Sequence, residues 1–423
     1  MAAASVSWCI YRDIQIEKEY TGDLRNRIVG SRLQKDDHAP YFYKWKKGDN
    51  IRYYDPQNFD SLKVANITAT PFFHQLIYPI ADLEQRDISR IWLVIEYCIL
   101  FIITAIAFSF AKNKYQQIAV IITTAIFLYA NAWTGHIAAG QLYLFIPFLA
   151  MLFYSFINSN KSIVNAGLAG ICAATLVLIR PNTILFLLPF MVFFNRYTVK
   201  YKVAFLSAAL VIFFFAFNSN QKILYWKDYR NSLVEQLKSH QSLEPSLQHN
   251  DADPVLTNWE GWDMQQTRKD AQAFPYTYNM EHGNVFVLAN HAFNIKTPVG
   301  ILVGVSFFLM LALFFLFYRK KRYSTSFTIY NIAILSFCLY MITDIFSPIH
   351  RFQYNGTQWL FPLLLVAAGY HPRYKWVYIG IIAGLIINSL NLSSMVMEQA
   401  LGEYIVFLFL LIFPFLYKPG TTK

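Results

Sequence analysis

The chain has 423 residues, of which 56% are hydrophobic and only 14% are charged. A water-soluble domain of this size cannot hide so much apolar surface, so the composition excludes that class and indicates a protein whose main solvent is a lipid bilayer. The formal net charge of +11 would suit a nucleic-acid or anionic-lipid ligand, but membrane proteins also concentrate lysine and arginine in their cytoplasmic loops. The positions of the charged residues therefore decide whether the net charge reflects ligand binding or membrane topology.

The hydrophobic segments predict an all-α, polytopic integral membrane protein with about eleven transmembrane helices. Several apolar runs are shorter than the roughly 20 residues that a perpendicular span needs. The runs cover residues 92–111, 116–133, 142–157, 164–179, 183–195, 202–218, 298–318, 326–346, 355–370, 374–390 and 404–417. They divide the chain into an N-terminal outer segment, a first group of transmembrane helices, a long outer loop and a C-terminal group of transmembrane helices, at residues 1–91, 92–218, 219–297 and 298–423.

Lysine and arginine fall in every second connection between these runs, and this sets the predicted orientation. Basic loops are cytoplasmic, so the other connections are expected to face outward. The basic residues concerned are Lys112, Lys114, Lys161, Arg196, Lys200, Lys202, Arg319, Lys320, Lys321, Arg322, Arg373, Lys375 and Lys418. Topology thus explains most of the net charge, so membrane lipids are expected partners and nucleic acid is not.

Two outer segments are too long to be simple connectors, which predicts that the chemistry lies there. The first of them starts near Tyr11. An outward segment should follow a span, and residues 2–10 are too short to form one. The first span is therefore expected to be missing or truncated.

The first outer segment places a carboxylate among guanidinium groups, in the run Gly22-Asp23-Leu24-Arg25-Asn26-Arg27. This run is predicted to lie at the membrane surface, with Asp23, Arg25 and Arg27 as candidate functional residues. A surface ion pair or a helix N-cap would explain the same residues without a function.

A polar turn between two spans, from Trp133 to Gln141, is also predicted to face outward. Gly140 permits a close backbone approach, and Gln141 offers both a hydrogen-bond donor and an acceptor. His136 and Gln141 are therefore candidate binding residues. A turn that only caps a helix is the alternative.

Arg180 lies between two apolar runs and is followed by Pro181. A guanidinium at such a position usually faces a cavity or an anion, which predicts an anionic ligand, although snorkelling to the lipid headgroups is an alternative. The same reasoning applies to His350 and Arg351, which follow the span that carries Asp344. A salt bridge between Asp344 and Arg351 is the competing interpretation.

The long outer loop contains aromatic residues next to carboxylates, in the run Trp259-Glu260-Gly261-Trp262-Asp263. Aromatic rings stack on the apolar faces of sugars and carboxylates bind their hydroxyls, so Trp259, Glu260 and Trp262 are candidate sugar-binding residues. A small satellite core is the alternative.

The sequence contains no P-loop, no G-x-S-x-G elbow and no H-E-x-x-H motif, and its four cysteines lie in apolar stretches without paired spacing. ATP-driven transport, serine hydrolysis and zinc proteolysis are therefore not indicated. Neither a metal site nor a cofactor is expected. Lipid-linked chemistry and transport remain as the functions that the sequence allows.

An ordered set of short motifs resembles glycosyltransferase family 87, whose members are GT-C type membrane enzymes that use polyprenyl-phosphate sugars, commonly mannose. The motifs are the run from Gly22 to Arg27, Gly140 with Gln141, Arg180 with Pro181 before a Leu185 to Pro189 stretch, and Pro348 with Arg351 before Phe361 and Pro362. The likeness extends from about residue 20 to residue 370, and Arg180 stands where many members have lysine.

The resemblance implies an inverting transfer of a hexose from a polyprenyl-phosphate donor to a lipid or glycan acceptor, with Asp23 as the general base. It implies that Arg180, Arg351 and His350 bind the donor phosphate. Acceptor or donor contacts would come from Arg25, Arg27, His136, Gln141, Trp259, Glu260 and Trp262. A bacterial inner-membrane location, with the active site facing the periplasm, follows from the same resemblance.

Two other functions fit the same architecture. A transporter or flippase for lipid-linked sugars would use the membrane charges but no catalytic base, and paired broken helices in internal repeats would favour it. A polysaccharide polymerase or ligase would act on diphosphate-linked chains and would not require Asp23.

Overall fold

The computed structural model describes residues 2–19, 22–46, 48–54, 67–159, 162–191, 194, 197–242, 299–323, 328–346, 351–390 and 397–417. Within these ranges the protein is all-helical, and no strand is present. The prediction of an all-α protein is therefore confirmed for the part of the chain that is described.

Among the described residues, α-helices and four 3-10 turns follow one another along the chain. The α-helices are α1 (Ala2–Glu19), α2 (Gly22–Lys35), α3 (Pro71–Leu76), α4 (Gln85–Phe110), α5 (Lys114–Tyr129), α6 (Asn131–Ala139), α7 (Phe145–Asn158), α8 (Ile163–Ile179), α9 (Ile184–Met191), α10 (Val199–Phe217), α11 (Asn220–Ser242), α14 (Val299–Tyr323), α15 (Ile329–Ile345), α16 (Leu360–Ala368), α17 (Lys375–Asn388) and α18 (Met397–Leu416). The 3-10 turns are η1 (Ile51–Tyr53), η2 (Pro181–Thr183), η4 (Gln353–Trp359) and η5 (Pro372–Tyr374).

Among the described helices, four are long and apolar enough to cross a membrane: α4, α10, α14 and α18. Helices α5 and α6 pass the same test only as a pair, and they are bent by 56° at Ala130. The predicted number of eleven spans is not confirmed, because several apolar runs form helices of 8 to 17 residues. The structure thus supports a helical protein with four or five helices that could span a bilayer.

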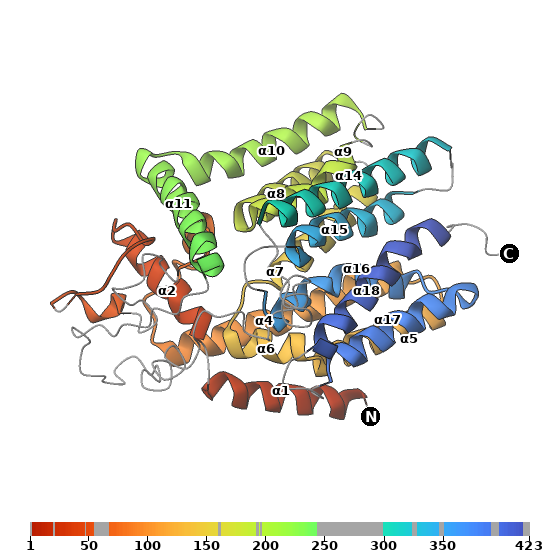
Figure 1. Cartoon of the computed structure of the whole chain (residues 1–423), viewed down its shortest axis with the longest axis horizontal. Helices are drawn as coiled ribbons and strands as arrows, with labels where there is room; N and C mark the ends of the chain where they lie inside the picture. Colours follow the sequence, from red (N-terminus) through yellow and green to blue (C-terminus); the bar gives the residue numbers. More distant parts are fainter. Residues whose placement is uncertain are drawn as a thin grey trace.

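Most of the long helices run side by side, whereas α2 and α11 lie at one end of the bundle (Figure 1). Helix α15 packs against α9, α14 and α18, and α16 packs against α4 and α5. Every residue of α16 is buried, so this helix of nine residues is a core element. Its apolar composition therefore reflects burial among other helices as much as contact with lipid.

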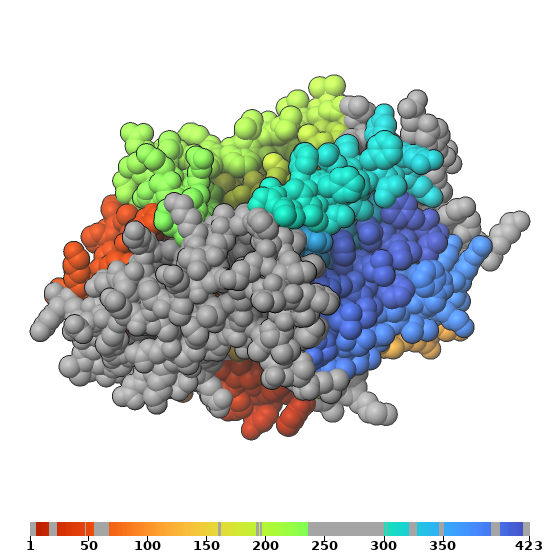
Figure 2. All heavy atoms as spheres, in the orientation of Figure 1, coloured from red at the N-terminus to blue at the C-terminus, as the bar shows by residue number. Residues whose placement is uncertain are grey.

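Helices α10 and α14 carry their apolar side chains on the outside of the bundle. Large exposed residues include Leu210 and Phe214 on α10 and Phe307 and Phe308 on α14. The space-filling view shows both helices at the surface (Figure 2). Such a wide apolar exterior is the pattern that a lipid environment favours.

Helix α1 extends to Glu19 and packs against α4, α5 and α6. Its buried Asp13 accepts hydrogen bonds from Tyr97 Oη at 2.6 Å and from Trp133 Nε1 at 2.7 Å. Residues 11–19, which were expected to begin the outer segment, are thus part of a helix on the side of the bundle. Only residues 20 and 21 separate this helix from α2 in the sequence.

Helices α17 and α18 approach each other so closely that a side chain does not fit at their crossing. A Cβ atom at Gly402 would lie 2.2 Å from the backbone nitrogen of Asn388. Glycine is therefore required here, as at many close crossings of membrane helices. This crossing fixes α18, which carries Glu403 into the site described next.

Candidate functional site

Asp23 lies in the first turn of α2, where the partial positive charge of the helix N-terminus favours a carboxylate. The side chain is partly exposed. It accepts a hydrogen bond from Gln141 Nε2, and the Tyr354 hydroxyl donates to it at 3.3 Å. The structure therefore joins Asp23 to two segments that are distant in the sequence, which an N-cap alone would not explain.

The turn after α6 brings Gln141 to Asp23. Gly140 adopts the left-handed conformation, with φ of 60°, and ends α6. A Cβ atom at this position would lie 2.5 Å from Leu24 Cβ, so only glycine lets the turn dock on α2. Arg27 completes the contact by donating to Gly140 O at 3.1 Å and to Gln141 Oε1 at 2.5 Å.

Arg180 caps the C-terminus of α8, and Pro181 prevents the helix from continuing. The guanidinium pairs with Asp344 of α15 and lies over the ring of Tyr143, with Cζ 4.8 Å from the ring centroid. Its side chain is 23% exposed, and its Nε has no hydrogen-bond partner among the described residues. The Nε itself is buried, so an anion would meet the exposed part of the guanidinium.

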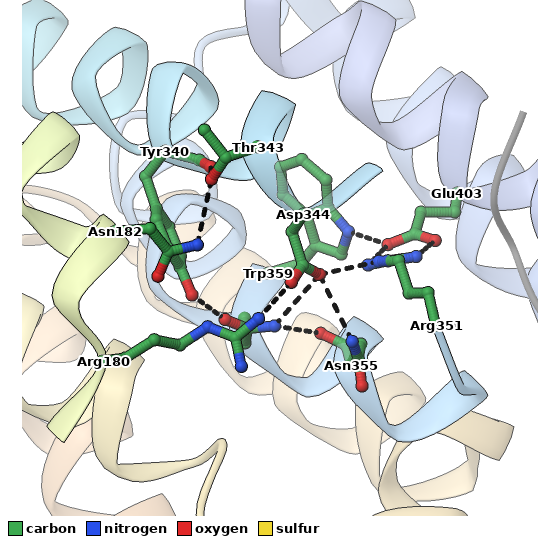
Figure 3. A network of polar contacts seen from close by, with 10 residues as sticks. Arg180, Asn182, Tyr340, Thr343, Asp344, Arg351, Asn355, Trp359 and Glu403 are labelled. Atoms are coloured by element: carbon green, nitrogen blue, oxygen red, sulfur yellow. Dashed lines mark hydrogen bonds and ion pairs between the residues drawn. The ribbon is translucent and has the colours of Figure 1, made fainter. Parts of the chain in front are cut away.

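Arg351 is held by carboxylates on two helices, as Figure 3 shows. Its Nε donates to Asp344 Oδ2 at 2.7 Å, and its two terminal nitrogens donate to Glu403. The guanidinium is only 2% exposed. The salt bridge between Asp344 and Arg351, considered above as the alternative to ligand binding, is therefore present.

Neutral donors complete the shell of the two carboxylates. Trp359 Nε1 donates to Glu403 at 2.5 Å, and Gln358 Nε2 donates to Asp344 at 3.3 Å. Asn355 Nδ2 lies 3.5 Å from Asp344 Oδ2, the oxygen that also accepts from Gln358. Glu403 was not predicted, although a carboxylate near the start of an apolar helix is a usable signal.

Two tyrosines connect the Asp23 and Arg180 groups. Tyr143 and Tyr354 are stacked, with ring centroids 5.7 Å apart and an angle of 21° between their planes. Phe352 stacks on Tyr354, with a centroid distance of 5.1 Å. Neither tyrosine was predicted, because nothing in the sequence distinguishes them among 28 tyrosines.

Tyr229 lies on α11, and the Arg180 guanidinium acts on its phenol electrostatically. Burial raises the pKa of Tyr229 to about 12, and the Arg180 guanidinium acts in the opposite direction. Tyr229 also packs against Tyr41, with ring centroids 5.6 Å apart. The phenol is thus neutral at physiological pH.

The remaining predicted residues have different positions. His136 pairs with Glu96 at 2.9 Å, both fully buried, and its backbone oxygen accepts from the backbone N–H of Gln141. His136 thus stabilises the turn that carries Gln141 through a backbone hydrogen bond. Arg25 is 1% exposed. His350, Trp259, Glu260 and Trp262 lie outside the described residues.

The described part of the chain contains no group of three or more His, Cys, Asp or Glu side chains that could hold a metal ion. The assembly is instead one of carboxylates, guanidinium groups, amides and phenols. Such a set can exchange a proton at Asp23 and bind an anion at Arg180.

Comparisons with known proteins give no relative: no family model, no curated protein and no solved structure matches this chain.

Proposed function

We propose that this protein is a membrane glycosyltransferase that moves a hexose from a polyprenyl-phosphate carrier to a hydroxyl group of a lipid or glycan acceptor. The proposed hexose is mannose. The observation that supports this most is the link from Asp23 to Arg180 through the stacked rings of Tyr354 and Tyr143. A group that can accept a proton and a group that can bind a phosphate are thereby parts of one assembly.

The proposed reaction is an inverting displacement at the anomeric carbon. The acceptor hydroxyl gives its proton to Asp23 while its oxygen attacks the anomeric carbon from the face opposite the phosphate. The bond between that carbon and the phosphate oxygen breaks, and its electron pair leaves with the polyprenyl phosphate. A phosphate is a good leaving group, so a single carboxylate suffices, unlike the two carboxylates of glycosidases.

Arg180 is the proposed contact for the departing phosphate. Its side chain is partly exposed and pairs with one carboxylate among the described residues, whereas Arg351 is enclosed by two carboxylates. A preorganised cation near a developing negative charge stabilises the transition state. The single positive charge of Arg180 matches the single negative charge of a phosphodiester better than the larger charge of a diphosphate.

The proposed active site faces the outside of the cell, at the inner membrane of a bacterium. Asp344 lies in the last turn of α15, whereas the basic run from Arg319 to Arg322 ends α14 shortly before α15 begins. The basic residues and the carboxylate network thus lie at opposite ends of α15. The positive-inside rule then supports an outward-facing site.

A reconstitution experiment tests the reaction class. Liposomes that contain the wild-type protein would receive polyprenyl-phosphate mannose, polyprenyl-diphosphate mannose or a nucleotide-linked mannose, together with extracted membrane lipids and glycans as acceptors. Mannosylated product from the monophosphate donor alone is expected. Movement of intact donor between the leaflets without product would instead indicate a flippase, and product only from the diphosphate donor would indicate a polymerase or ligase.

A further inference from the structure

Gln141 lies between a guanidinium and the proposed catalytic carboxylate. Its Nε2 donates to Asp23 Oδ2, and its Oε1 accepts from Arg27 Nη2 at 2.5 Å. The side chain is 1% exposed. The amide thus separates two opposite charges that lie one helical turn apart on α2.

The residue types leave one orientation for this amide. A guanidinium can only donate hydrogen bonds, and an ionised carboxylate can only accept them. The oxygen of Gln141 must therefore face Arg27 and its nitrogen must face Asp23. Arg27 is itself fixed by its bond to Gly140 O at 3.1 Å, so the whole arrangement is anchored on the turn.

The neutral amide between the two charges affects how readily Asp23 accepts a proton. A direct pair with Arg27 would favour the ionised carboxylate strongly and make it a weak base. A hydrogen bond from a neutral amide favours ionisation less. It still fixes the direction of the carboxylate, which a general base needs in order to meet the acceptor hydroxyl.

We infer that Gln141 is a positioning residue that orients the Asp23 carboxylate and keeps it from pairing directly with Arg27. This inference rests on the proposed function for its catalytic meaning. Its structural content concerns only how Asp23 is held, and it can be measured without any substrate.

Two substitutions separate this role from simple packing. Gln141→Met preserves the approximate volume, so it still separates Asp23 from Arg27, but it neither donates to Asp23 nor accepts from Arg27. Gln141→Glu keeps the contact with Arg27 but faces Asp23 with a second carboxylate. Two carboxylates at hydrogen-bond distance share a proton, so one of them holds it to a higher pH.

The first readout is the titration of Asp23 itself. Protein labelled with ¹³C at the aspartate carboxyl carbon would be followed by NMR in micelles, with Asp23→Asn identifying the signal. We expect the midpoint to rise by up to about one pH unit in Gln141→Met and by more in Gln141→Glu. Gln117→Glu, which adds the same charge at the far end of α5, should leave it unchanged. Unchanged midpoints in both Gln141 variants would overturn the inference.

The second readout is the pH profile of kcat/KM for hexose transfer. The acidic side of this profile should shift to higher pH by as much as the Asp23 midpoint does. The activity of Gln141→Glu should therefore recover at higher pH. A loss of kcat at every pH without a shift of the profile would show a merely structural role and overturn the inference. Shifted Asp23 midpoints in the Gln141 variants, together with no hexose transfer by the wild-type protein, would support the positioning role of Gln141 and refute the proposed function.

Discussion

Tyr354 stacks on Tyr143 with ring centroids 5.7 Å apart, and each ring touches one charged group of the site. The Tyr354 hydroxyl donates to Asp23 at 3.3 Å, and Arg180 lies over the Tyr143 ring. Offset aromatic stacking and cation–π contacts each contribute about 1 kcal/mol. The spacing between the proposed base and the proposed phosphate contact is therefore set by side-chain packing.

The stack predicts graded effects of substitutions at Tyr354. Tyr354→Phe removes one hydrogen bond and should lower kcat about three- to tenfold, since such a bond contributes about 1 kcal/mol. Tyr354→Leu also removes the stack and should lower kcat substantially further. Steady-state kinetics of both variants check this, with Tyr115→Leu at an exposed site as the control. Equal losses in the two variants would show that the stack has no part in catalysis.

Substitutions of Arg351 and Arg180 are expected to affect different properties, stability for Arg351 and donor binding for Arg180. Arg351→Met leaves the buried carboxylate of Glu403 without its guanidinium partner, although Asp344 keeps Arg180, and breaking such a buried pair typically costs about 3–5 kcal/mol of stability. Arg180→Met should raise the KM for the lipid donor with a smaller loss of stability, because Arg180 is partly exposed. Thermal unfolding in detergent and donor titrations distinguish them. The opposite order, with Arg351 controlling KM and Arg180 controlling stability, would refute the assignment.

His74 in α3 predicts a pH dependence of stability. Burial and, to a smaller extent, the Arg27 guanidinium lower the pKa of His74 to about 3. Between this value and the unfolded value of about 6.5, only the unfolded chain binds the proton, so stability falls as the pH decreases below about 6.5. At pH 5 the loss is about 2 kcal/mol relative to pH 7.5.

Substituting His74 provides the test of this dependence. The melting temperature of His74→Gln should fall less between pH 7.5 and pH 5 than that of the wild type. His38→Gln, at an exposed position, is the matched control and should behave like the wild type. An undiminished decrease in His74→Gln would assign the pH dependence to other groups.

Gly140→Ala should disturb both the turn and Asp23. Alanine at φ of 60° costs roughly 1–2 kcal/mol, and its Cβ would collide with Leu24 Cβ. We expect lower stability together with a loss of transfer greater than tenfold, because the turn carries Gln141. Gly300→Ala, in α14 with no atom within 4 Å of the new Cβ, is the control. Full activity in Gly140→Ala would show that the turn does not position Gln141.

The helical class and several candidate residues could be predicted from the sequence, because hydrophobic runs and isolated charges are local signals. Asp23, Gln141 and Arg180 were singled out in this way. Their partners could not be predicted, since Gln141 and Asp23 are 118 positions apart. Tertiary packing decides which charges meet.

The number of membrane spans could not be predicted for a related reason. The apolar run that contains α16 predicts a span, but α16 has nine residues and is completely buried among its neighbours. The apolar composition of a hydrophobic segment is the same whether lipid or protein surrounds it in the folded structure. The role of Arg351 was ambiguous because its second partner, Glu403, lies 52 positions away on α18.

The most direct test of the account is transfer from polyprenyl-phosphate mannose in liposomes by Asp23→Asn and Asp87→Asn. Asp87 is the matched control, because it is an exposed aspartate in the first turn of α4, as Asp23 is in the first turn of α2. A lost general base typically costs 10²- to 10⁴-fold. We predict a loss of this order in Asp23→Asn, with folding and donor binding intact, and wild-type transfer in Asp87→Asn. Transfer by Asp23→Asn at the wild-type rate would contradict the account.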